Sequence, residues 1–172
     1  MDNFLIKNGI NNWQIQQLIN LTNTDDDIKK FTSDQKRFSS IEAFEEWKKK
    51  GRSIYILTND QEDLLGIFWL GEKKLPEADY DESFDRNKFG ITFGIRIYGE
   101  ARGKGMASNF MNEAINRFKD SKIYNEIPEK GIWLETKVHN LAAIKLYTKF
   151  GFKVVSLANE RGEVVMVQSE TL

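Results

Sequence analysis

The stretch ITFGIRIYGEARGKGMASNFMNEAINRF, residues 91–118, decides the predicted fold of this chain. Apolar residues alternate at Phe93, Ile95 and Ile97, a spacing that is typical of a strand. After a glycine-rich turn, apolar residues return at the spacing of one helix face. These residues are Met106, Ala107, Phe110, Met111, Ala114, Ile115 and Phe118. The stretch therefore predicts a strand, a tight turn and an amphipathic helix.

The segment ARGKGMA, residues 101–107, lies where the predicted strand gives way to the helix. Gly103 and Gly105 lack side chains, so a ligand can approach the backbone closely there. The first N–H groups of a helix have no intrahelical partner and carry the positive end of the helix dipole. We therefore expect this corner to bind the phosphate of a cofactor.

Two common phosphate-binding motifs do not fit the turn. A P-loop needs four residues between its first glycine and a Gly-Lys pair, and then Ser or Thr. Here only three residues separate Gly99 from Gly103, and Gly105 follows the lysine. The dinucleotide fingerprint is approached, but its third small position is Ser108, and Asp120 matches the expected acidic position only weakly.

The pattern that fits is Arg102-x-x-Gly105-x-Ala107, which resembles the acyl-CoA pyrophosphate loop of the GNAT N-acetyltransferase superfamily. A second block, GIWLETKVHNLAAIKLYTKFGFKVV at residues 131–155, resembles the strand, Asn-led helix and Gly-Phe turn that end the GNAT core. Its matching positions are Asn140, Ala143, Tyr147, Gly151 and Phe152. The two blocks stand in the family's order, and the resemblance covers about residues 50–170.

This resemblance implies an α/β (α+β) fold. A mixed, mostly antiparallel sheet is flanked by helices and splayed between its fourth and fifth strands. From periodicity and capping residues, strands are expected at about 3–7, 54–57, 64–70, 91–98, 131–138, 152–157 and 163–168. Helices are expected at about 12–21, 41–50, 105–119 and 140–149, the first capped by Asn12. Residues 1–172 are expected to form a single domain.

Composition narrows the classes of function. The 25 basic and 26 acidic residues give a formal charge of -1, so no overall basic field attracts nucleic acid. The absence of cysteine excludes disulfides, thiolate zinc sites and a cysteine nucleophile. With a single histidine, His139, no histidine cluster can bind metal, and His139 is expected on an exposed loop. No secretion signal or membrane-spanning apolar run is seen, so a cytoplasmic protein is expected, with a homodimer left open.

The resemblance implies how acetyl-CoA is held. Backbone N–H groups from Gly103 to Ala107 would hold the pyrophosphate, Arg102 or Lys104 could add charge, and the pantetheine arm would pair with the strand end at Ile95 and Ile97. Gly94, within that strand, is either a bulge that opens the slot or a packing glycine. The residues assigned to the cofactor are Ile95, Arg96, Ile97, Arg102, Gly103, Lys104, Gly105, Met106, Ala107 and Asn140.

Two residues are candidates for acid and base. Tyr147 occupies the position of the family's thiolate-protonating tyrosine, and the alternative is a core tyrosine with a satisfied hydroxyl. Glu135 precedes it by twelve residues, the spacing at which ribosomal-protein N-terminal acetyltransferases place their base. Alternatively, Glu135 forms an ion pair with Lys137 or another cation. In that case ordered water would act as the base.

The expected function is transfer of an acetyl group from acetyl-CoA to a primary amine by direct attack in a ternary complex, without a metal, nucleic acid or membrane partner. A non-catalytic acyl-CoA sensor of the same fold is the alternative. The acidic loop at residues 77–85 either attracts a cationic amine, such as a polyamine, an aminoglycoside or a peptide N-terminus, or is simply solvated. Arg96 and Trp69 face the acceptor or serve packing.

Overall fold

The computed structural model describes residues 4–32, 34, 36–127 and 130–168. The chain forms two compact units, each built from two stretches of sequence. The first unit comprises Met1–Leu70 and Gly94–Ser121, and the second comprises Gly71–Phe93 and Lys122–Leu172. The two units are described separately below.

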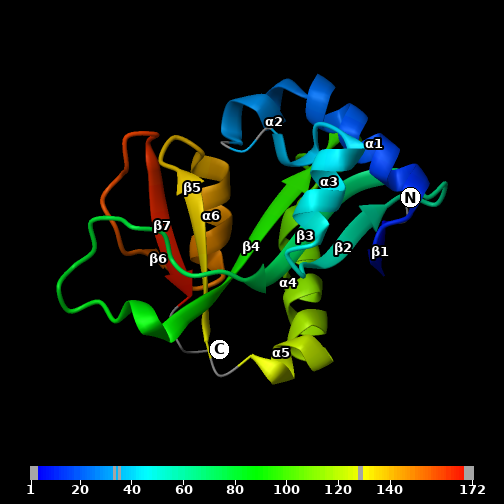
Figure 1. Cartoon of the computed structure of the whole chain (residues 1–172). Helices are drawn as coiled ribbons and strands as arrows, with labels where there is room; N and C mark the ends of the chain where they lie inside the picture. The colour runs from blue at the N-terminus through cyan, green and yellow to red at the C-terminus, as the bar shows by residue number, and fades with distance from the viewer. Residues whose placement is uncertain (1–3, 33, 35, 128–129, 169–172) are drawn as a thin grey trace. The chain divides into compact units, whose positions relative to one another are not determined.

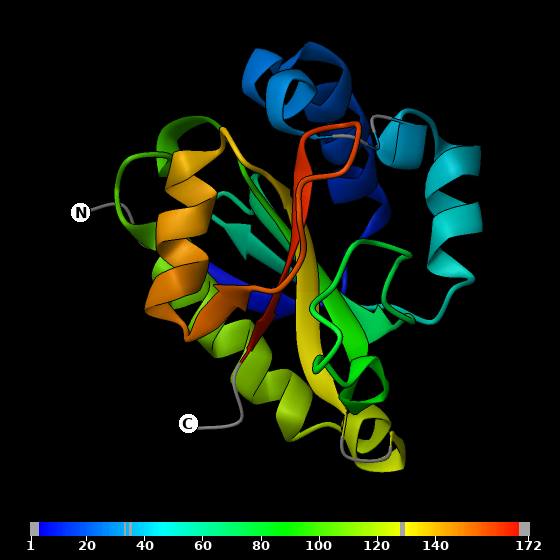
Figure 2. The same ribbon diagram turned by 90° about the vertical axis from the view of Figure 1, so that its left-hand side faces the viewer.

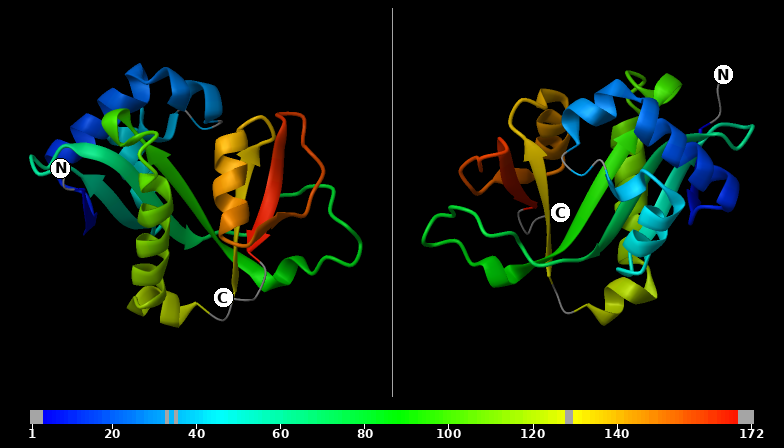
Figure 3. Two further views of the ribbon diagram at one scale, coloured as in Figure 1. Left: turned by 180° about the vertical axis from the view of Figure 1, so that it is seen from behind. Right: turned by 45° about the horizontal axis from the view of Figure 1, so that its top comes forward.

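The first unit surrounds strands with helices on both faces. Its elements are β1 (Leu5–Asn8), α1 (Asn12–Thr24), α2 (Asp26–Phe31), the 3-10 turn η1 (Lys36–Phe38), α3 (Ile41–Lys48), β2 (Ser53–Thr58), most of β3 (Leu64–Glu72), the end of β4 (Phe89–Ile97), η3 (Gly99–Ala101) and α4 (Met106–Lys119). Helices α1 and α3 lie over one face of β2 and β3 (Figure 1). Helix α4 covers the other face, which is seen best from behind (Figure 3).

The second unit is a smaller layered arrangement. It contains the start of β4, η2 (Arg86–Lys88), α5 (Lys122–Glu126), β5 (Gly131–Lys137), α6 (Leu141–Lys149), β6 (Phe152–Val154) and β7 (Glu163–Gln168). Figure 2 shows α6 on one side of β5 and β7, and the loop that follows β3 on the other side. The two faces of β5 are therefore covered by different parts of the chain.

The strand pairing confirms the predicted fold class. In the first unit the order is β1-β2-β3-β4, and β2 pairs antiparallel with both β1 and β3. In the second unit the order is β4-β5-β7-β6, in which β4 and β5 are parallel and the other pairs antiparallel. The register of β4 with β5 extends only from Phe89 to Thr92, although both strands continue further. The splay expected between the fourth and fifth strands stays a prediction.

Aromatic rings form much of the first unit's core. Trp47 and Trp69 meet edge to face with their centroids 5.7 Å apart. Phe38 lies 4.8 Å from Trp47 and 5.5 Å from Trp69, again edge to face. Such contacts add to the stabilisation from burial alone, because the positive ring edge meets the negative ring face. On the other face of the strands, α4 buries Phe110, Met111, Ala114, Ile115 and Phe118, which confirms most of its predicted apolar stripe.

Several predicted boundaries were wrong by a few residues. The cap of α1 is Asn11, not Asn12, because Gln14 completes a reciprocal capping box with Asn11. The polar residues 22–27 end α1 and begin α2, whose cap is Asp25. Strand β4 begins at Phe89 rather than Ile91, and α5 was not predicted. Asn140 caps α6, as predicted, and the strand predicted at 131–138 extends over Gly131–Lys137.

Gly94 proves to be a packing position. A Cβ built at Gly94 would lie 2.1 Å from Cζ2 of Trp69, far inside van der Waals contact. The register shift of β4 against β5 falls between Phe89 and Ile91, and not at Gly94. The glycine therefore makes room for the indole ring, which anchors the aromatic core described above.

Replacing Gly94 with alanine should destabilise the protein by about 1–3 kcal/mol, because the new methyl group overpacks the core against Trp69. Urea unfolding of Gly94→Ala would measure this loss. In a Trp69→Phe background, the smaller ring vacates the space, so the same substitution should cost less. An equal cost in the two backgrounds would contradict the proposed clash.

Candidate functional site

The glycine-rich turn before α4 leaves backbone amides accessible. Gly103 and Gly105 have φ angles of +72° and +73°, in the left-handed region that glycine adopts without strain. A Cβ built at either position would meet no atom within 4 Å. Gly105 caps α4 without a side-chain hydrogen bond of its own. The turn therefore leaves room for a phosphate group, and phosphate binding there stays a prediction.

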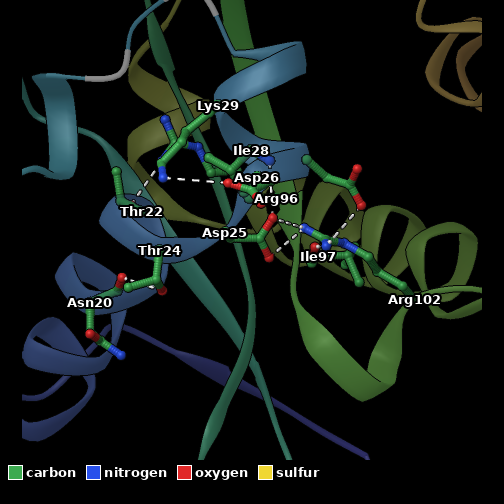
Figure 4. A network of polar contacts seen from close by, with 11 residues as sticks. Asn20, Thr22, Thr24, Asp25, Asp26, Ile28, Lys29, Arg96, Ile97 and Arg102 are labelled. Atoms are coloured by element: carbon green, nitrogen blue, oxygen red, sulfur yellow. Dashed lines mark hydrogen bonds and ion pairs between the residues drawn. The ribbon is translucent and has the colours of Figure 1, made fainter.

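The side chain of Arg102 connects this turn to the end of β4 and the start of α2 (Figure 4). Its Nε donates to the carbonyl oxygen of Ile97 at 2.8 Å. One terminal nitrogen lies 2.8 Å from both carboxylate oxygens of Asp25, and the other lies 3.1 Å from Oδ2 of Asp27. The guanidinium that was expected to add charge for the pyrophosphate is thus engaged by the protein itself.

Asp25 has two tasks in this network. It caps α2 by accepting from the amide of Ile28 at 3.0 Å, and it pairs with Arg102. Burial alone would raise the pKa of Asp25, but the hydrogen bonds from Arg102 and Ile28 and the Arg102 charge hold that pKa below its ordinary value. The carboxylate is therefore charged at neutral pH. The sequence analysis missed this role, although the acidic run at 25–27 was visible.

The end of β4 has the mixed exposure expected of a ligand-pairing strand. Ile95 and Ile97 are half-buried, whereas Arg96 between them is only 4% exposed. The strand continues into Tyr98, whose amide donates to the carbonyl oxygen of Leu65 on β3 at 2.8 Å. The backbone of the strand end is thus held in place on its β3 side.

The remaining residues of the predicted loop begin α4 or flank it. Met106 and Ala107 are half-buried in the first turn of the helix. The ammonium group of Lys104 lies 5.3 Å from the ring centroid of Phe4, a cation–π contact. All nine first-unit residues assigned to the cofactor thus lie on one continuous strand, turn and helix start, at positions 95–97 and 102–107.

In the second unit, Asn140 and Tyr147 lie on α6. Asn140 caps the helix, since its Oδ1 accepts from the amide of Ala143 at 3.2 Å. Tyr147, near the other end of the helix, is 8% exposed and packs edge to face against Phe93 and Phe152. Burial raises the pKa of the Tyr147 phenol above its ordinary value, so the phenol keeps its proton at neutral pH.

Glu135 is half-buried in the middle of β5. Burial raises the pKa of this carboxyl, nearby Lys73 lowers it, Glu163 raises it again and Arg161 lowers it, with a net rise. Arg161 lies 4.0 Å from Oε1, so the predicted ion pair forms with Arg161 rather than with Lys137. A carboxyl with a raised pKa in this position is typical of a general base.

The side chain of Glu135 and helix α6, which carries Tyr147, lie on opposite faces of β5. Glu135 shares its face with Trp133, which packs against Leu75 in the loop after β3. Tyr147 belongs to α6, and that helix covers the other face (Figure 2). The two groups are therefore suited to serve different reacting atoms, and they do not form a hydrogen-bonded pair.

Three of the five carboxylates in the acidic loop at 77–85 have partners within the loop or just after it. Both oxygens of Glu77 accept from Arg86, at 2.9 and 3.1 Å. Asp81 accepts from the amide of Ser83 and Asp85 from the amide of Asn87, both as local turn contacts. A hollow of about 510 Å³ beside this loop is lined by residues of both charges, including Glu72, Lys74, Asp85, Arg86 and Lys130. This arrangement favours the solvated-loop interpretation.

His139 is exposed in the turn before α6, as predicted. Within the part of the chain that the structure describes, no helix is long and apolar enough to span a membrane.

Comparisons with known proteins agree with this architecture. A model of the acetyltransferase (GNAT) family matches residues 15–152. No match was found among curated protein sequences. Among solved structures, a provisionally assigned acetyltransferase from Acinetobacter baylyi ADP1 has a TM-score of 0.70 at 17% identity, covering 100% of this chain and 94% of its own.

Two similar structures contain coenzyme A. Spermidine N-acetyltransferase from Vibrio cholerae, in complex with CoA and spermine, has a TM-score of 0.63 at 22% identity over 95% of this chain and 92% of its own. An aminoglycoside acetyltransferase in complex with coenzyme A has a TM-score of 0.65 at 16% identity, over 98% of this chain and 95% of its own. At these identities the likeness establishes the fold. Because the family model spans most of the sequence and both blocks of motif residues, this chain belongs to the GNAT acetyltransferase family.

Proposed function

We propose that the protein is an N-acetyltransferase that moves an acetyl group from acetyl-CoA to a primary amine in a ternary complex. The observation that carries this proposal is the open glycine turn at the start of α4 in a chain of the GNAT family. The family model covers stretches of both compact units, so we also propose that residues 1–172 act as one catalytic domain.

The cofactor would be held by main-chain groups. The amides of Gly103 to Ala107 would bind the pyrophosphate, and the backbone of Ile95 and Ile97 would pair with the pantetheine arm. Because Arg102 is bound by Asp25 and Ile97, its proposed role is to fix the turn. Lys104 would add charge, Asn140 would contact the arm while it caps α6, and Arg96 would contribute its main chain.

Acetyl transfer requires a neutral amine and a protonated leaving thiol. Tyr147 would donate to the departing thiolate, since burial preserves its proton. Glu135, directly or through ordered water, would accept the proton that the amine loses. With no cysteine in the chain, the amine would attack the thioester directly and not through an acyl-cysteine.

An acyl-CoA sensor of the same fold is the second candidate. A sensor needs the glycine turn, but it needs neither a leaving-group acid nor a base. The buried, proton-retaining phenol of Tyr147 favours the enzyme. The similar structures named above bind spermine or coenzyme A, so a polyamine or an aminoglycoside is one candidate acceptor for this chain.

Gly105→Ala should weaken CoA binding roughly tenfold or more, because the added methyl group occupies the cradle and disturbs amide–phosphate hydrogen bonds. Calorimetric titration with CoA measures this. The matched control is Gly162→Ala, since Gly162 has a φ of +70° and equally open surroundings. Both variants should lose about 1–2 kcal/mol of stability from the left-handed backbone. Equal CoA affinities would place the pyrophosphate elsewhere.

Tyr147→Phe should lower kcat by roughly 10²- to 10⁴-fold while CoA affinity changes little, because only proton donation is lost. Thiol release from acetyl-CoA with an amine panel reports the rate. Tyr55→Phe, another buried tyrosine, serves as the control for removal of a phenol oxygen. Unchanged turnover in Tyr147→Phe would assign Tyr147 to the core instead.

Glu135→Gln should remove the acidic limb of the kcat/KM profile if Glu135 is the base, because the limb reports ionisation of that carboxyl. The raised pKa also fixes the sign of the stability effect. Folding favours the protonated form, so the glutamine variant should be at least as stable as wild type at neutral pH, and any gain should vanish at acidic pH. Persistence of the limb in the variant would indicate ordered water as the base.

A further inference from the structure

The first unit buries an arginine without a matching carboxylate. Arg96 is 4% exposed, and its two terminal nitrogens donate to the hydroxyl of Thr22 at 3.1 Å and to the backbone carbonyl of Asp34 at 3.2 Å. Among the residues that the structure describes, no carboxylate lies within ion-pair distance of this guanidinium. Both of its acceptors are neutral, and burying a charge is costly without a counter-charge.

A second guanidinium lies against the same aromatic ring. The Cζ atoms of Arg37 and Arg96 are 5.0 and 6.0 Å from the ring centroid of Trp69, and Arg96 is also 4.8 Å from Phe38. The carboxylate of Asp34 is occupied by Arg37, through a 2.9 Å ion pair and a 3.1 Å bond from the Arg37 amide. Arg37 thus has a carboxylate partner, whereas Arg96, which contacts Asp34 through its backbone carbonyl, has none among the described residues.

The electrostatics of Arg37 reflect this excess of positive charge. Burial lowers the pKa of its guanidinium, Asp34 raises it, and the charges of Arg96 and then Arg52 lower it again, with a net fall. Arg37 remains charged, as arginine does in proteins. An added anion would relieve the repulsion among these groups.

Two buried polar atoms in the same region have no hydrogen-bond partner in the described structure. The Nε of Arg37, a hydrogen-bond donor, is buried without an acceptor in the described structure. The hydroxyl of Tyr98, a residue only 1% exposed, lies close to Arg96 and Thr22, but neither reaches it with hydrogen-bond geometry. Buried polar groups are nearly always satisfied, so such atoms indicate a missing ligand or water.

We propose that Arg37 and Arg96, beside Trp69, bind an anionic group of the acceptor, so that the acceptor is a primary amine that also carries a carboxylate, phosphonate or phosphate. Guanidinium groups bind such oxyanions through paired hydrogen bonds. Arg37, whose side chain is 25% exposed, forms the accessible side of the cluster, and Arg96 forms its floor. This inference rests on the proposed acetyl transfer.

The position of the cluster suits an acceptor. Arg96 lies between Ile95 and Ile97, the residues proposed to pair with the arm that carries the thioester. In contrast, the loop at 77–85, which was considered for a cationic amine, has its Glu77 carboxylate neutralised by Arg86. The unmatched charge of Arg96, next to Arg37, favours an acceptor that carries negative charge.

The test compares three amines of similar length whose far ends differ in charge: 4-aminobutyrate, 3-aminopropylphosphonate and 1,4-diaminobutane. The wild type should show a kcat/KM at least about tenfold higher for the anionic amines. In Arg37→Gln, the KM for these amines should rise about tenfold or more, while the KM for acetyl-CoA stays unchanged. Arg117→Gln is the matched control, since Arg117 pairs with Glu113 on α4, away from Trp69.

A second measurement does not depend on the shape of the acceptor. With CoA saturating the glycine turn, sulfate at constant ionic strength should raise the unfolding midpoint of wild type and of Arg117→Gln more than that of Arg37→Gln. If Arg96→Gln still unfolds cooperatively, sulfate should raise its unfolding midpoint as little as that of Arg37→Gln. If Arg96→Gln does not unfold cooperatively, the response of Arg37→Gln alone tests the anion site.

The outcomes separate this inference from the proposed function. Absence of a sulfate effect in the CoA complex, or an equal effect in Arg37→Gln, would overturn the anion site while leaving acetyl transfer intact. A higher kcat/KM for 1,4-diaminobutane than for the anionic amines would likewise overturn the anion site and leave acetyl transfer intact. If CoA does not bind, the proposed function fails, and the sulfate response of the CoA-free wild type against Arg37→Gln still reports on the arginine cluster.

Discussion

The guanidinium of Arg102 joins two parts of the first unit that are distant in sequence, the end of β4 and the start of α2. It binds the last carbonyl of β4 at Ile97, the capping carboxylate of α2 at Asp25, and Asp27 in the first turn of α2. Because Gly103 and Gly105 are flexible by nature, the turn between β4 and α4 needs such an anchor to keep one conformation. The direction of the first amides of α4, and with it the proposed phosphate site, depends on these bonds.

Charge is distributed differently in the two units. In the second unit some of the described charged side chains form exposed ion pairs, such as Glu77–Arg86 and Glu72–Lys130. In the first unit Arg102 is matched by Asp25 and Asp27 and Arg37 by Asp34, whereas Arg96 has no carboxylate partner among the described residues. Exposed ion pairs such as those of the second unit contribute little to stability. A buried charge without a counter-charge, in contrast, is costly enough to need a reason. A ligand that supplies the missing charge is such a reason.

Local features of the fold were predictable from the sequence because they depend on neighbouring residues. The alternation in β4, the apolar stripe of α4 and the cap at Asn140 are all of this kind. Asn11 and Asn12 could not be separated by residue type, and only the reciprocal bond with Gln14 distinguishes them. The open glycine turn was likewise visible as a local pattern.

Features that depend on distant residues could not be predicted. Arg96 meets Thr22 across 74 positions and Arg102 meets Asp25 across 77, and no periodicity encodes such pairs. The role of Gly94 became clear only from the position of the Trp69 ring, and Glu135 found Arg161 rather than the nearer Lys137. The candidate site was therefore predictable as a set of backbone positions, but not as a set of charges.

Burial acts on the two proposed catalytic groups in the same direction and suits each to a different task. Removing a group from water disfavours its charged form, so the pKa of both Tyr147 and Glu135 rises. For the phenol, a higher pKa keeps the proton in place at neutral pH, so Tyr147 would act on the sulfur as a protonated hydrogen-bond donor rather than as a strong acid. For the carboxyl, a higher pKa means a stronger base, and the charges of Lys73 and Arg161 limit the rise. One physical effect, on groups at opposite faces of β5, thus acts on both the proposed acid and the proposed base.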